Sequence, residues 1–415
     1  MYILFIITLL IRVASSYFSY ENYHHFTINL HKERDLGTLS KLNSQFGDDI
    51  DFFIREEHIG GRVQFFVNHL TSKSVHSFLK THNASYTYIT KDSWIDSSFV
   101  PKRKKRSVVG DKINLNVYHS YDDFIKYLFA LKNKYKNMIS IKKIGKSYEG
   151  RSIYTFTIGY QSDKTKPIIF LESGIHAREW ITQSSLIILI DYIMKNSDKY
   201  NDILKDVDIV IVPCVNPDGY EYSRRSKRMW RGNRNITKSQ SYGVDLNRNF
   251  PTGWNVEPDH FETYPGVTPS SELETTVIID FLTKNKKFIK GFLSLHSYGR
   301  YLLLPWNYKK NHYPPEYKDT YDLGKKMIES VRNKTKSTYE LGTGADLLYP
   351  SNGVSTDFAR SIGIKYAYTI EFLPSSNYTE IGFIVPEKMI PLAGEELKYL
   401  FIPFLEHLYG EYIKN

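Results

Sequence analysis

The sequence predicts an α/β fold, in which a large domain with a central mixed, largely parallel sheet flanked by helices follows a small α+β domain. In the larger part of the chain, apolar strand-like runs alternate with helix-like runs, the order that builds a mainly parallel sheet. A basic cluster at residues 102–106 separates this part from an N-terminal segment of shorter elements. The length of 415 residues and the hydrophobic content of 41% suffice for a large core and a second, smaller one.

The N-terminal segment is predicted to contain short strands and a helix. Residues 26–30 and 64–67 are β-branched and aromatic runs typical of strands, and residues 36–46 have a helical pattern. No cluster of catalytic residue types falls in this segment. It therefore has no predicted chemistry of its own.

The larger segment is predicted to begin with an amphipathic helix over residues 121–135, in which Phe124, Leu128 and Leu131 recur at helical spacing. Strands are expected at 166–171, 208–213, 292–295 and 366–372, and helices at 180–194, at 271–283 with Ser270 or Ser271 as the N-cap, and through most of 387–412. In such sheets ligands bind beyond the carboxyl ends of the strands. Polar residues that directly follow these strands are therefore the candidates for a site.

Residues 1–16 have the pattern of a secretory signal peptide. Residues 2–10 are an apolar run too short to span a membrane comfortably, and Ala14 and Ser16 are the small residues that precede a cut after Ser16. Because the first residues lack a basic side chain and Arg12 interrupts the apolar end, a buried N-terminal strand is the alternative. Four glycosylation acceptors fit secretion: Asn83, Asn235, Asn333 and Asn377. We expect a secreted, extracellular protein without a membrane anchor.

The net charge of +10 and pI of 9.1 raise nucleic acid as a partner. Much of the basic excess lies in residues 102–106 and in lysine-rich stretches, and no basic motif is interleaved with aromatic residues, so we expect no nucleic-acid partner. The run from Arg103 to Arg106 matches the multibasic pattern that secretory convertases cut. A solvated charge run is the alternative.

Three candidate zinc ligands directly follow predicted strands. His176 and Glu179 come after the strand at 166–171, and His296 comes after the strand at 292–295. Zinc accepts imidazole nitrogen and carboxylate oxygen, and a catalytic zinc keeps one position open for water. A histidine by itself is more often a hydrogen-bonded core residue. The residues around the three candidates therefore decide their interpretation.

Those surroundings contain several motifs. Gly174-Ile-His-Ala-Arg-Glu-Trp-Ile181 holds two of the candidate ligands, and further motifs follow the same order as in one known family, at residues 144–152, 216–220, 228–231, 243–249, 271–272, 295–298, 349 and 369–372. Together they resemble the carboxypeptidase A/B family of zinc metallocarboxypeptidases over nearly all of residues 107–415. The resemblance implies an eight-stranded sheet, one zinc ion per chain, and hydrolysis of the C-terminal peptide bond of peptides and proteins with a free C-terminus.

The resemblance also implies roles for individual residues in the reaction. His176, Glu179 and His296 correspond to the zinc ligands, and Glu371 to the general base. Arg231 corresponds to the arginine that stabilises the developing oxyanion. For Glu371 alone, an ion pair at the end of the sheet is the simpler interpretation, but a lone carboxylate in an apolar run needs a partner or a task.

A second set of residues is implied to bind substrate. Asn247 and Arg248 match the pair that holds the terminal carboxylate, which suits the planar, bidentate fork of arginine. Tyr349 matches a mobile tyrosine that closes over the substrate, and Arg178 an accessory arginine. Asp245 is placed like the acid that orients a ligand histidine.

The specificity pocket is implied to be neutral. The family position seven residues after the mobile tyrosine is Thr356, and the other lining positions are Leu303, Asn307, Gly344, Ser351 and Thr369. Because none is charged, a charged terminal side chain would be desolvated without a counter-ion. We expect a preference for neutral aliphatic or aromatic C-terminal residues.

The family's organisation implies a signal peptide at residues 1–16, an activation propeptide at 17–106 and a catalytic domain at 107–415, with an activating protease acting at the multibasic run. Two other functions are weaker. A non-catalytic, peptide-binding member would lack Glu371 or a ligand, and a regulatory carboxypeptidase that trims basic residues would have an acidic pocket and an extra C-terminal β-domain. Cys214 is the single cysteine, so the intramolecular disulfide that many relatives carry cannot form.

Overall fold

The computed structural model describes residues 23–47, 49–55, 58–89, 108–109, 112–236, 243–255, 261–375 and 382–414. The predicted signal peptide, the multibasic run and Asn377 lie outside the described residues. The boundaries predicted after residues 16 and 106 lie there too and stay predictions.

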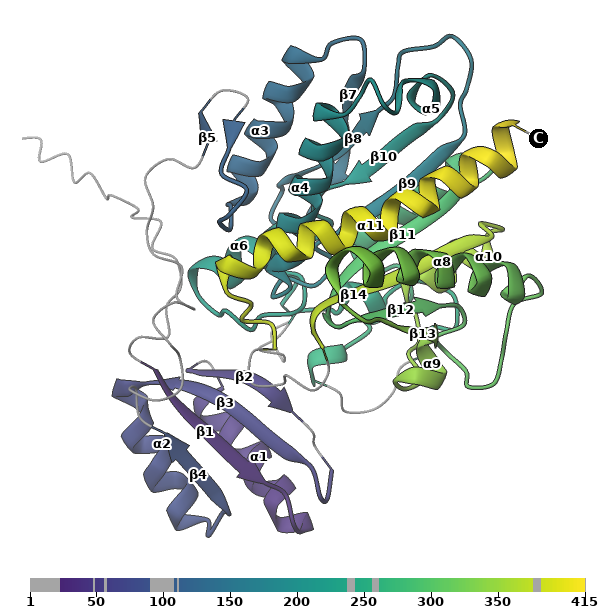
Figure 1. The fold of residues 1–415 in the computed structure, drawn as a ribbon. Coiled ribbons are helices and arrows are strands. Elements are labelled where there is room, and N and C mark those ends of the chain that lie inside the picture. The colour runs from purple at the N-terminus through teal and green to yellow at the C-terminus, as the bar shows by residue number, and fades with distance from the viewer. Residues whose placement is uncertain are drawn as a thin grey trace, which may run out of the picture.

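The N-terminal domain is a small α+β sandwich (Figure 1). Its elements are β1 (Tyr23–Asn29), α1 (Glu33–Phe46), β2 (Ile50–Arg55), β3 (Arg62–Asn68), α2 (His69–Thr81) and β4 (Tyr86–Ile89). The strands pair antiparallel in the order β2-β3-β1-β4. Alternate strand residues such as Phe26 and Ile28 pack against Leu39 and Leu42 of α1 and form one core. The predicted small α+β domain is confirmed.

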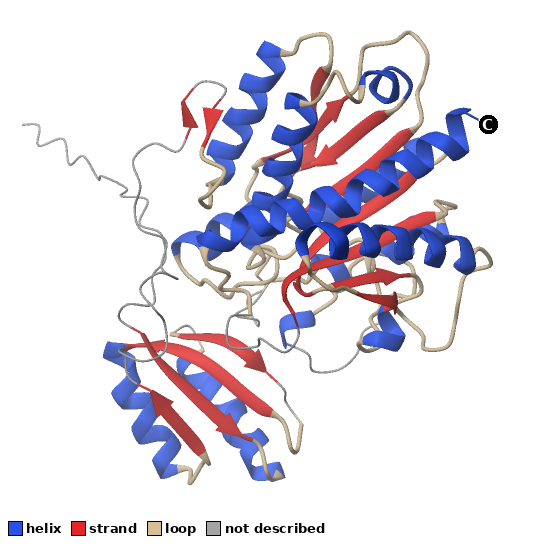
Figure 2. Ribbon diagram, in the orientation of Figure 1, coloured by secondary structure: helices blue, strands red, loops and turns tan. Residues whose placement is uncertain are grey.

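The large domain is built around one sheet between two layers of helices (Figures 1 and 2). Two very short strands, β5 (Val108–Val109) and β6 (Lys112–Ile113), precede it. Its strands are β7 (Ile139–Lys146), β8 (Ser152–Ile158), β9 (Ile168–Ser173), β10 (Asp208–Val212), β11 (Ile289–Gly299), β12 (Tyr301–Leu304), β13 (Glu340–Thr343) and β14 (Tyr366–Ser375). Its helices are α3 (Tyr121–Lys134), α4 (Trp180–Lys195), α5 (Asn201–Asp206), α6 (Pro217–Arg225), α7 (Leu273–Asn285), α8 (Tyr317–Thr335), α9 (Gly344–Leu347), α10 (Ser355–Ser361) and α11 (Ile390–Tyr409), with a 3₁₀ turn η3 at Leu246–Arg248.

The eight strands form a mixed sheet in the order β13-β12-β14-β11-β9-β10-β8-β7. The central strands β14, β11, β9 and β10 run parallel, whereas β7, β8 and the β12–β14 pairing are antiparallel. The predicted mixed, largely parallel eight-stranded sheet is confirmed. Because β9, β11 and β14 are parallel neighbours, their carboxyl ends meet at one edge of the sheet.

Both faces of the sheet are covered, so its central strands β9 and β10 are apolar on both sides. In β10, Ile209 and Ile211 face the core shared with α3, α4, α8 and α11, while Val210 and Val212 face the core shared with α7 and α10. This explains why the sequence shows continuous apolar runs rather than alternation. None of the helices in the described part of the chain combines the length and the apolar composition that crossing a bilayer requires.

The predicted N-cap of the helix near residue 271 is wrong. Helix α7 begins after Glu272, which makes no side-chain cap bond. Instead, Asn249 accepts a hydrogen bond from the Glu272 amide at 3.1 Å and donates one to Ser271 Oγ at 3.0 Å. The Asn249 side chain, distant in sequence, therefore holds Ser271 and Glu272 at the start of α7.

Candidate metal centre and substrate site

Two neighbouring strands deliver the three candidate ligands to the same edge of the sheet. His176 follows β9 after a turn at Gly174, which has φ of +66° and where a Cβ would lie 2.3 Å from Gln183 Nε2. Glu179 is the residue at which α4 begins, and His296 lies near the end of β11. All three are buried. We call them the metal triad.

The metal triad has the geometry of a zinc site. One donor atom from each residue lies within 4.8 Å of the others. The two Nδ1 atoms of His176 and His296 face each other at 3.1 Å, and Glu179 Oε1 lies 2.7 Å from Nδ1 of His176. Tetrahedral zinc with bonds of about 2.0–2.2 Å places its ligand atoms about 3.3 Å apart. The donors therefore fit this ion.

The outer nitrogens of both histidines are held by hydrogen-bond acceptors. His176 Nε2 lies 3.1 Å from Asp245 Oδ1. His296 Nε2 lies 2.9 Å from Ser294 Oγ, whose own proton is donated to Glu172 at 2.8 Å. A proton on each Nε2 satisfies both acceptors, and in this tautomer both Nδ1 lone pairs face inward, as metal binding requires. Two lone pairs at 3.1 Å repel each other unless a cation lies between them.

The electrostatic setting agrees with this arrangement. Burial is the main cause that lowers the pKa of His176, and Arg231 lowers it further, so the neutral, metal-binding form is favoured. Burial would raise the pKa of Glu179, but His176 and His296 outweigh it and lower this pKa. For His296, burial would lower the pKa, but the hydrogen bond and the negative charge of Glu179 outweigh burial and raise it.

Sequence reasoning missed Ser294 and Glu172. Glu172 is fully buried within the apolar strand β9. A carboxylate in an apolar run is costly unless it has a polar partner, and this was the signal in the sequence that could have identified it. Ser294 lies two residues before His296 in β11, and residues at this spacing share a face of a strand. Asp245 was predicted in this role and does contact His176.

Arg231 and Glu371 lie beside the metal triad. Arg231 Nε donates to Asp245 Oδ2 at 2.8 Å, and its Nη1 lies 3.9 Å from Glu179 Oε1. Glu371 in β14 is the register partner of His296 in β11. Burial raises the pKa of Glu371 to about 8, and nearby His296 is the largest opposing influence. A divalent cation at the triad would bring this pKa down, as opposite charges favour the ionised form.

Asn247 and Arg248 lie on η3, next to the metal triad. Asp245 caps this turn by accepting from the Asn247 amide at 2.9 Å, and Asn247 Nδ2 lies 3.5 Å from His296 Nε2. Arg248 is half-buried and donates to the Asn247 carbonyl at 2.8 Å and to Ser351 Oγ at 3.2 Å. It has no carboxylate partner within ion-pair distance among the described residues. Tyr349 is 58% exposed, so its side chain is free of packing that would hold it.

The predicted pocket residues also come together. Leu303 of β12 pairs with Thr369 of β14, and the hydroxyl groups of Thr369 and Thr356 are 2.5 Å apart. The Ser351 amide donates to the Asn307 carbonyl at 2.7 Å. The Asn307 side chain lies against Gly344, where a Cβ would be 1.8 Å from Asn307 Oδ1. One neighbour was not foreseen from sequence: the buried Asp357, which accepts hydrogen bonds from Asn307.

Arg178 is already paired in this structure. Its guanidinium lies 3.1 Å from Glu262 Oε2 and stacks over the ring of Phe383, with 4.1 Å to the ring centre. Sequence reasoning did not single out Glu262. An accessory role for Arg178 would require substrate to compete with this carboxylate.

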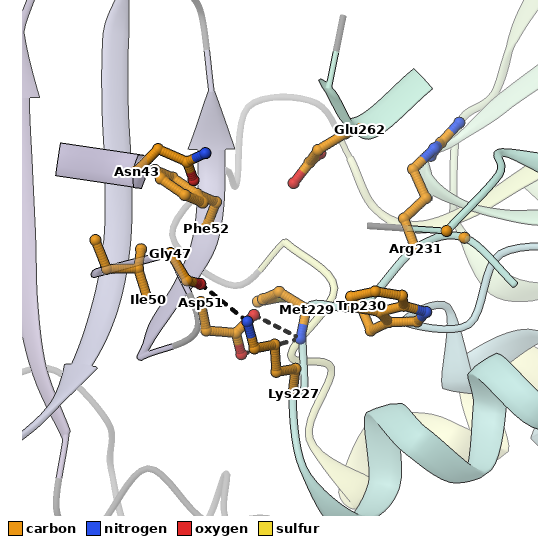
Figure 3. Close-up of a pocket in the computed structure, with 12 residues that line it drawn as sticks. Asn43, Gly47, Ile50, Asp51, Phe52, Lys227, Met229, Trp230, Arg231 and Glu262 are labelled. Atoms are coloured by element: carbon orange, nitrogen blue, oxygen red, sulfur yellow. Dashed lines mark hydrogen bonds between the residues drawn. The ribbon is translucent and has the colours of Figure 1, made fainter. Parts of the chain in front are cut away.

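The N-terminal domain contacts the large domain directly beside Arg231. Both carboxylate oxygens of Asp51 accept from the Met229 amide, at 3.2 and 3.1 Å, and Lys227 Nζ donates to the Gly47 carbonyl at 2.9 Å (Figure 3). A pocket at this boundary is lined by Asn43, Gly47, Ile50, Asp51 and Phe52 on one side and by Lys227, Met229, Trp230, Arg231, Gly232, Gly243 and Glu262 on the other. The Arg231 guanidinium points away from Asp51 (Figure 3).

Comparison with known proteins gives a consistent result. A zinc carboxypeptidase family model matches residues 124–399. Carboxypeptidase O from Bos taurus is 32% identical over 305 residues, which cover 72% of this chain and 80% of that protein, and carboxypeptidase B from Astacus astacus is 35% identical over 286 residues, covering 67% and 93%.

Solved structures agree with the fold. The crystal structure of thrombin activatable fibrinolysis inhibitor matches with a TM-score of 0.76 at 24% identity, covering 94% of this chain and 100% of that one. The bovine protein of that name, solved with tick carboxypeptidase inhibitor, matches with a TM-score of 0.64 at 29% identity, covering 71% and 98%. With the metal triad in place, these matches lead to one conclusion: the chain belongs to the zinc carboxypeptidase family and is a metallocarboxypeptidase, a hydrolase that acts on peptides with a free C-terminus.

Proposed function

We propose that this chain is a secreted proenzyme whose activated form removes single neutral residues from the C-terminus of peptides and proteins. The observation that carries the proposal is a half-buried arginine, Arg248, without a carboxylate partner among the described residues, on the turn that also contacts His296. A positive charge left unpaired beside the metal triad suits an anionic ligand.

Arg248 and Asn247 are proposed to hold the terminal carboxylate of the substrate. Arginine binds a carboxylate through two parallel hydrogen bonds, and its free donors allow this here. An internal residue of a peptide has no such carboxylate, so this contact selects the chain end. The exposed Tyr349, near Arg248 through the shared neighbour Ser351, is proposed to close over the bound residue.

The catalytic groups are proposed as follows. Zinc, when held by the metal triad, supplies a Lewis acid and lowers the pKa of water toward about 7. Glu371 accepts a proton from the attacking water and returns it to the amine of the leaving residue. Arg231, oriented by Asp245, donates to the scissile carbonyl oxygen as negative charge develops there.

The pocket is proposed to accept neutral side chains. Its predicted lining includes Leu303 and the paired hydroxyl groups of Thr356 and Thr369, and none of the predicted lining positions is charged. A terminal lysine, arginine or acidic residue would lose its hydration without gaining a counter-ion.

Secretion and activation complete the proposal. Asn83 and Asn333 are exposed, as glycosylation requires, whereas the side-chain amide of Asn235 donates to Glu272 at 3.0 Å. The contacts of Asp51 and Lys227 support an N-terminal domain that blocks the approach to Arg231 until a protease cuts the multibasic run at 103–106.

A panel of blocked dipeptides that differ only in the terminal residue tests the proposal, with and without a metal chelator. We expect hydrolysis of neutral residues, lost with chelator and restored by zinc. Best turnover of terminal lysine or arginine would contradict the pocket argument.

Glu371→Gln tests the proposed base. We expect turnover to fall below detection while the zinc content of the protein is kept. Glu329→Gln, on an exposed position of α8, serves as the matched control and should behave as the unmodified protein. Normal turnover in Glu371→Gln would remove this residue from the mechanism.

A further inference from the structure

The amide group of Asn307 is fixed in one orientation by a buried acid. Asp357 is fully buried and accepts three hydrogen bonds from Asn307: the backbone amide reaches both carboxylate oxygens at 3.0 and 2.8 Å, and Nδ2 reaches Oδ1 at 2.8 Å. An ionised carboxylate only accepts hydrogen bonds. The NH₂ group of Asn307 must therefore face Asp357, and Oδ1 must face the opposite way.

Asn307 Oδ1 is left as an open acceptor. It receives no hydrogen bond from any described residue, although the residue as a whole is only 5% exposed. Among the described residues, Oδ1 is not one of the polar atoms that are both unpaired and fully enclosed, so it still borders open space. Gly344 leaves the room for it, because a Cβ there would lie 1.8 Å from this oxygen.

The residues around Asn307 belong to the proposed specificity pocket, and the predicted lining residue Gly344 lies against Oδ1 itself. The Asn307 carbonyl accepts from Ser351, and Thr356, which directly precedes Asp357, shares a hydrogen bond with Thr369. An aliphatic terminal side chain that filled this pocket would strip water from Oδ1 and offer no hydrogen bond in return, which penalises that substrate.

We infer that Asn307, positioned by Asp357, makes the enzyme select C-terminal residues whose neutral side chain ends in a hydrogen-bond donor, with asparagine and glutamine as the preferred substrates. The inference rests on the proposed exopeptidase function and narrows its substrate class. Asp357 acts as a positioning residue, because it touches Asn307 rather than the substrate. Asn307 makes the contact.

Paired substrates of nearly equal shape test the inference. Blocked dipeptides ending in asparagine or leucine, and in glutamine or methionine, are compared with the zinc-loaded full chain after proteolytic activation. The assay is run at pH 8.5, where Asp357 is ionised, since burial raises its pKa to about 7. We expect kcat/KM to favour asparagine over leucine, and glutamine over methionine, by about fivefold to 100-fold, the range for a buried polar group left unpaired by the wrong substrate.

Two variants assign the effect. Asn307→Leu removes the oxygen and should reverse the preference toward leucine and methionine. Asp357→Asn frees the Asn307 amide to rotate and should bring both ratios toward one. A general structural defect lowers kcat/KM for both members of a pair and leaves their ratio unchanged. Asp191→Asn, near the end of α4 opposite to Glu179, is the matched control and should keep the ratios of the unmodified protein.

The outcomes separate this inference from the proposed function. If no dipeptide is hydrolysed, the exopeptidase proposal itself fails. If neutral dipeptides are hydrolysed but leucine equals or exceeds asparagine in the unmodified protein, or if Asn307→Leu keeps the preference for asparagine, only the role of Asn307 is overturned. Best hydrolysis of terminal lysine would also overturn it, because the acceptor would then serve a cation.

Discussion

Asp245 is the residue on which the metal triad and Arg231 both depend. It is fully buried, and its two oxygens have separate tasks. Oδ1 accepts from His176 Nε2 at 3.1 Å and from the Asn247 amide at 2.9 Å, whereas Oδ2 accepts from Arg231 Nε at 2.8 Å. Replacing Asp245 by asparagine keeps the shape and removes one acceptor.

The position of the new amide in the Asp245→Asn variant follows from these contacts. Two donors converge on Oδ1 and one on Oδ2, so the remaining side-chain oxygen is expected at the Oδ1 position. The introduced NH₂ group then faces Arg231 Nε, where two donors meet. His176 keeps a hydrogen-bond acceptor, but that acceptor is no longer charged. Loss of such a partner usually lowers metal affinity 10–100-fold, and we expect the lower end of this range, or about 1.4 kcal/mol. Displacing Arg231 should lower kcat/KM by about 100-fold to 1,000-fold even at saturating zinc.

Two measurements separate these effects. Competition with a chromogenic chelator gives the zinc Kd, and hydrolysis of a blocked dipeptide at saturating zinc gives kcat/KM. Asp218→Asn is the matched control, since Asp218 is equally buried and pairs with Arg151 at 2.6 Å but does not contact the metal triad. It should lower the free energy of unfolding and leave the zinc Kd unchanged. If Asp245→Asn keeps kcat/KM within twofold at saturating zinc, Asp245 does not orient Arg231.

Three further predictions concern other parts of the molecule. Asp51→Ala removes the acceptor of the Met229 amide, and a hydrogen bond to a charged group contributes about 1.5–3 kcal/mol to holding the N-terminal domain in place. The uncleaved variant should therefore hydrolyse a blocked dipeptide about tenfold faster or more, and an unchanged rate would mean that this contact does not hold the domain closed. Burial raises the pKa of Glu274 to about 7, so the contribution of this residue to folding stability is complete below its unfolded pKa near 4.5 and is lost as the pH rises through 7. In chemical unfolding at pH 5–8, the free energy of unfolding should fall more steeply with pH for the unmodified protein than for Glu274→Gln, and parallel curves would refute this. Cys214 is buried and burial raises its pKa to about 12, so maleimide should label the unfolded but not the folded protein at pH 8, and rapid labelling of the folded protein would contradict its burial.

The spacing of apolar residues predicted the helices and strands well, because this spacing depends on which face of each element is buried. The helix predicted at 121–135 is α3 at Tyr121–Lys134, and the strand predicted at 208–213 is β10 at Asp208–Val212. The start of α7 could not be predicted this way, since the helix begins after Glu272 and the Asn249 side chain, more than twenty residues away, holds Ser271 and Glu272 there. The metal triad was predicted from its motifs, and its geometry in the folded chain fits that prediction.

The sequence by itself determined the family, the α/β architecture and which side chains are available for chemistry, because motif residues and apolar periodicity are written along the chain. Only the tertiary structure decided which polar groups meet across the fold: Ser294 and Glu172 behind His296, Glu262 on Arg178, and Asp357 on Asn307. Such pairings depend on how strands far apart in sequence come to lie side by side. A hydrogen bond needs its partners within about 3 Å, a condition that spacing along the chain does not set.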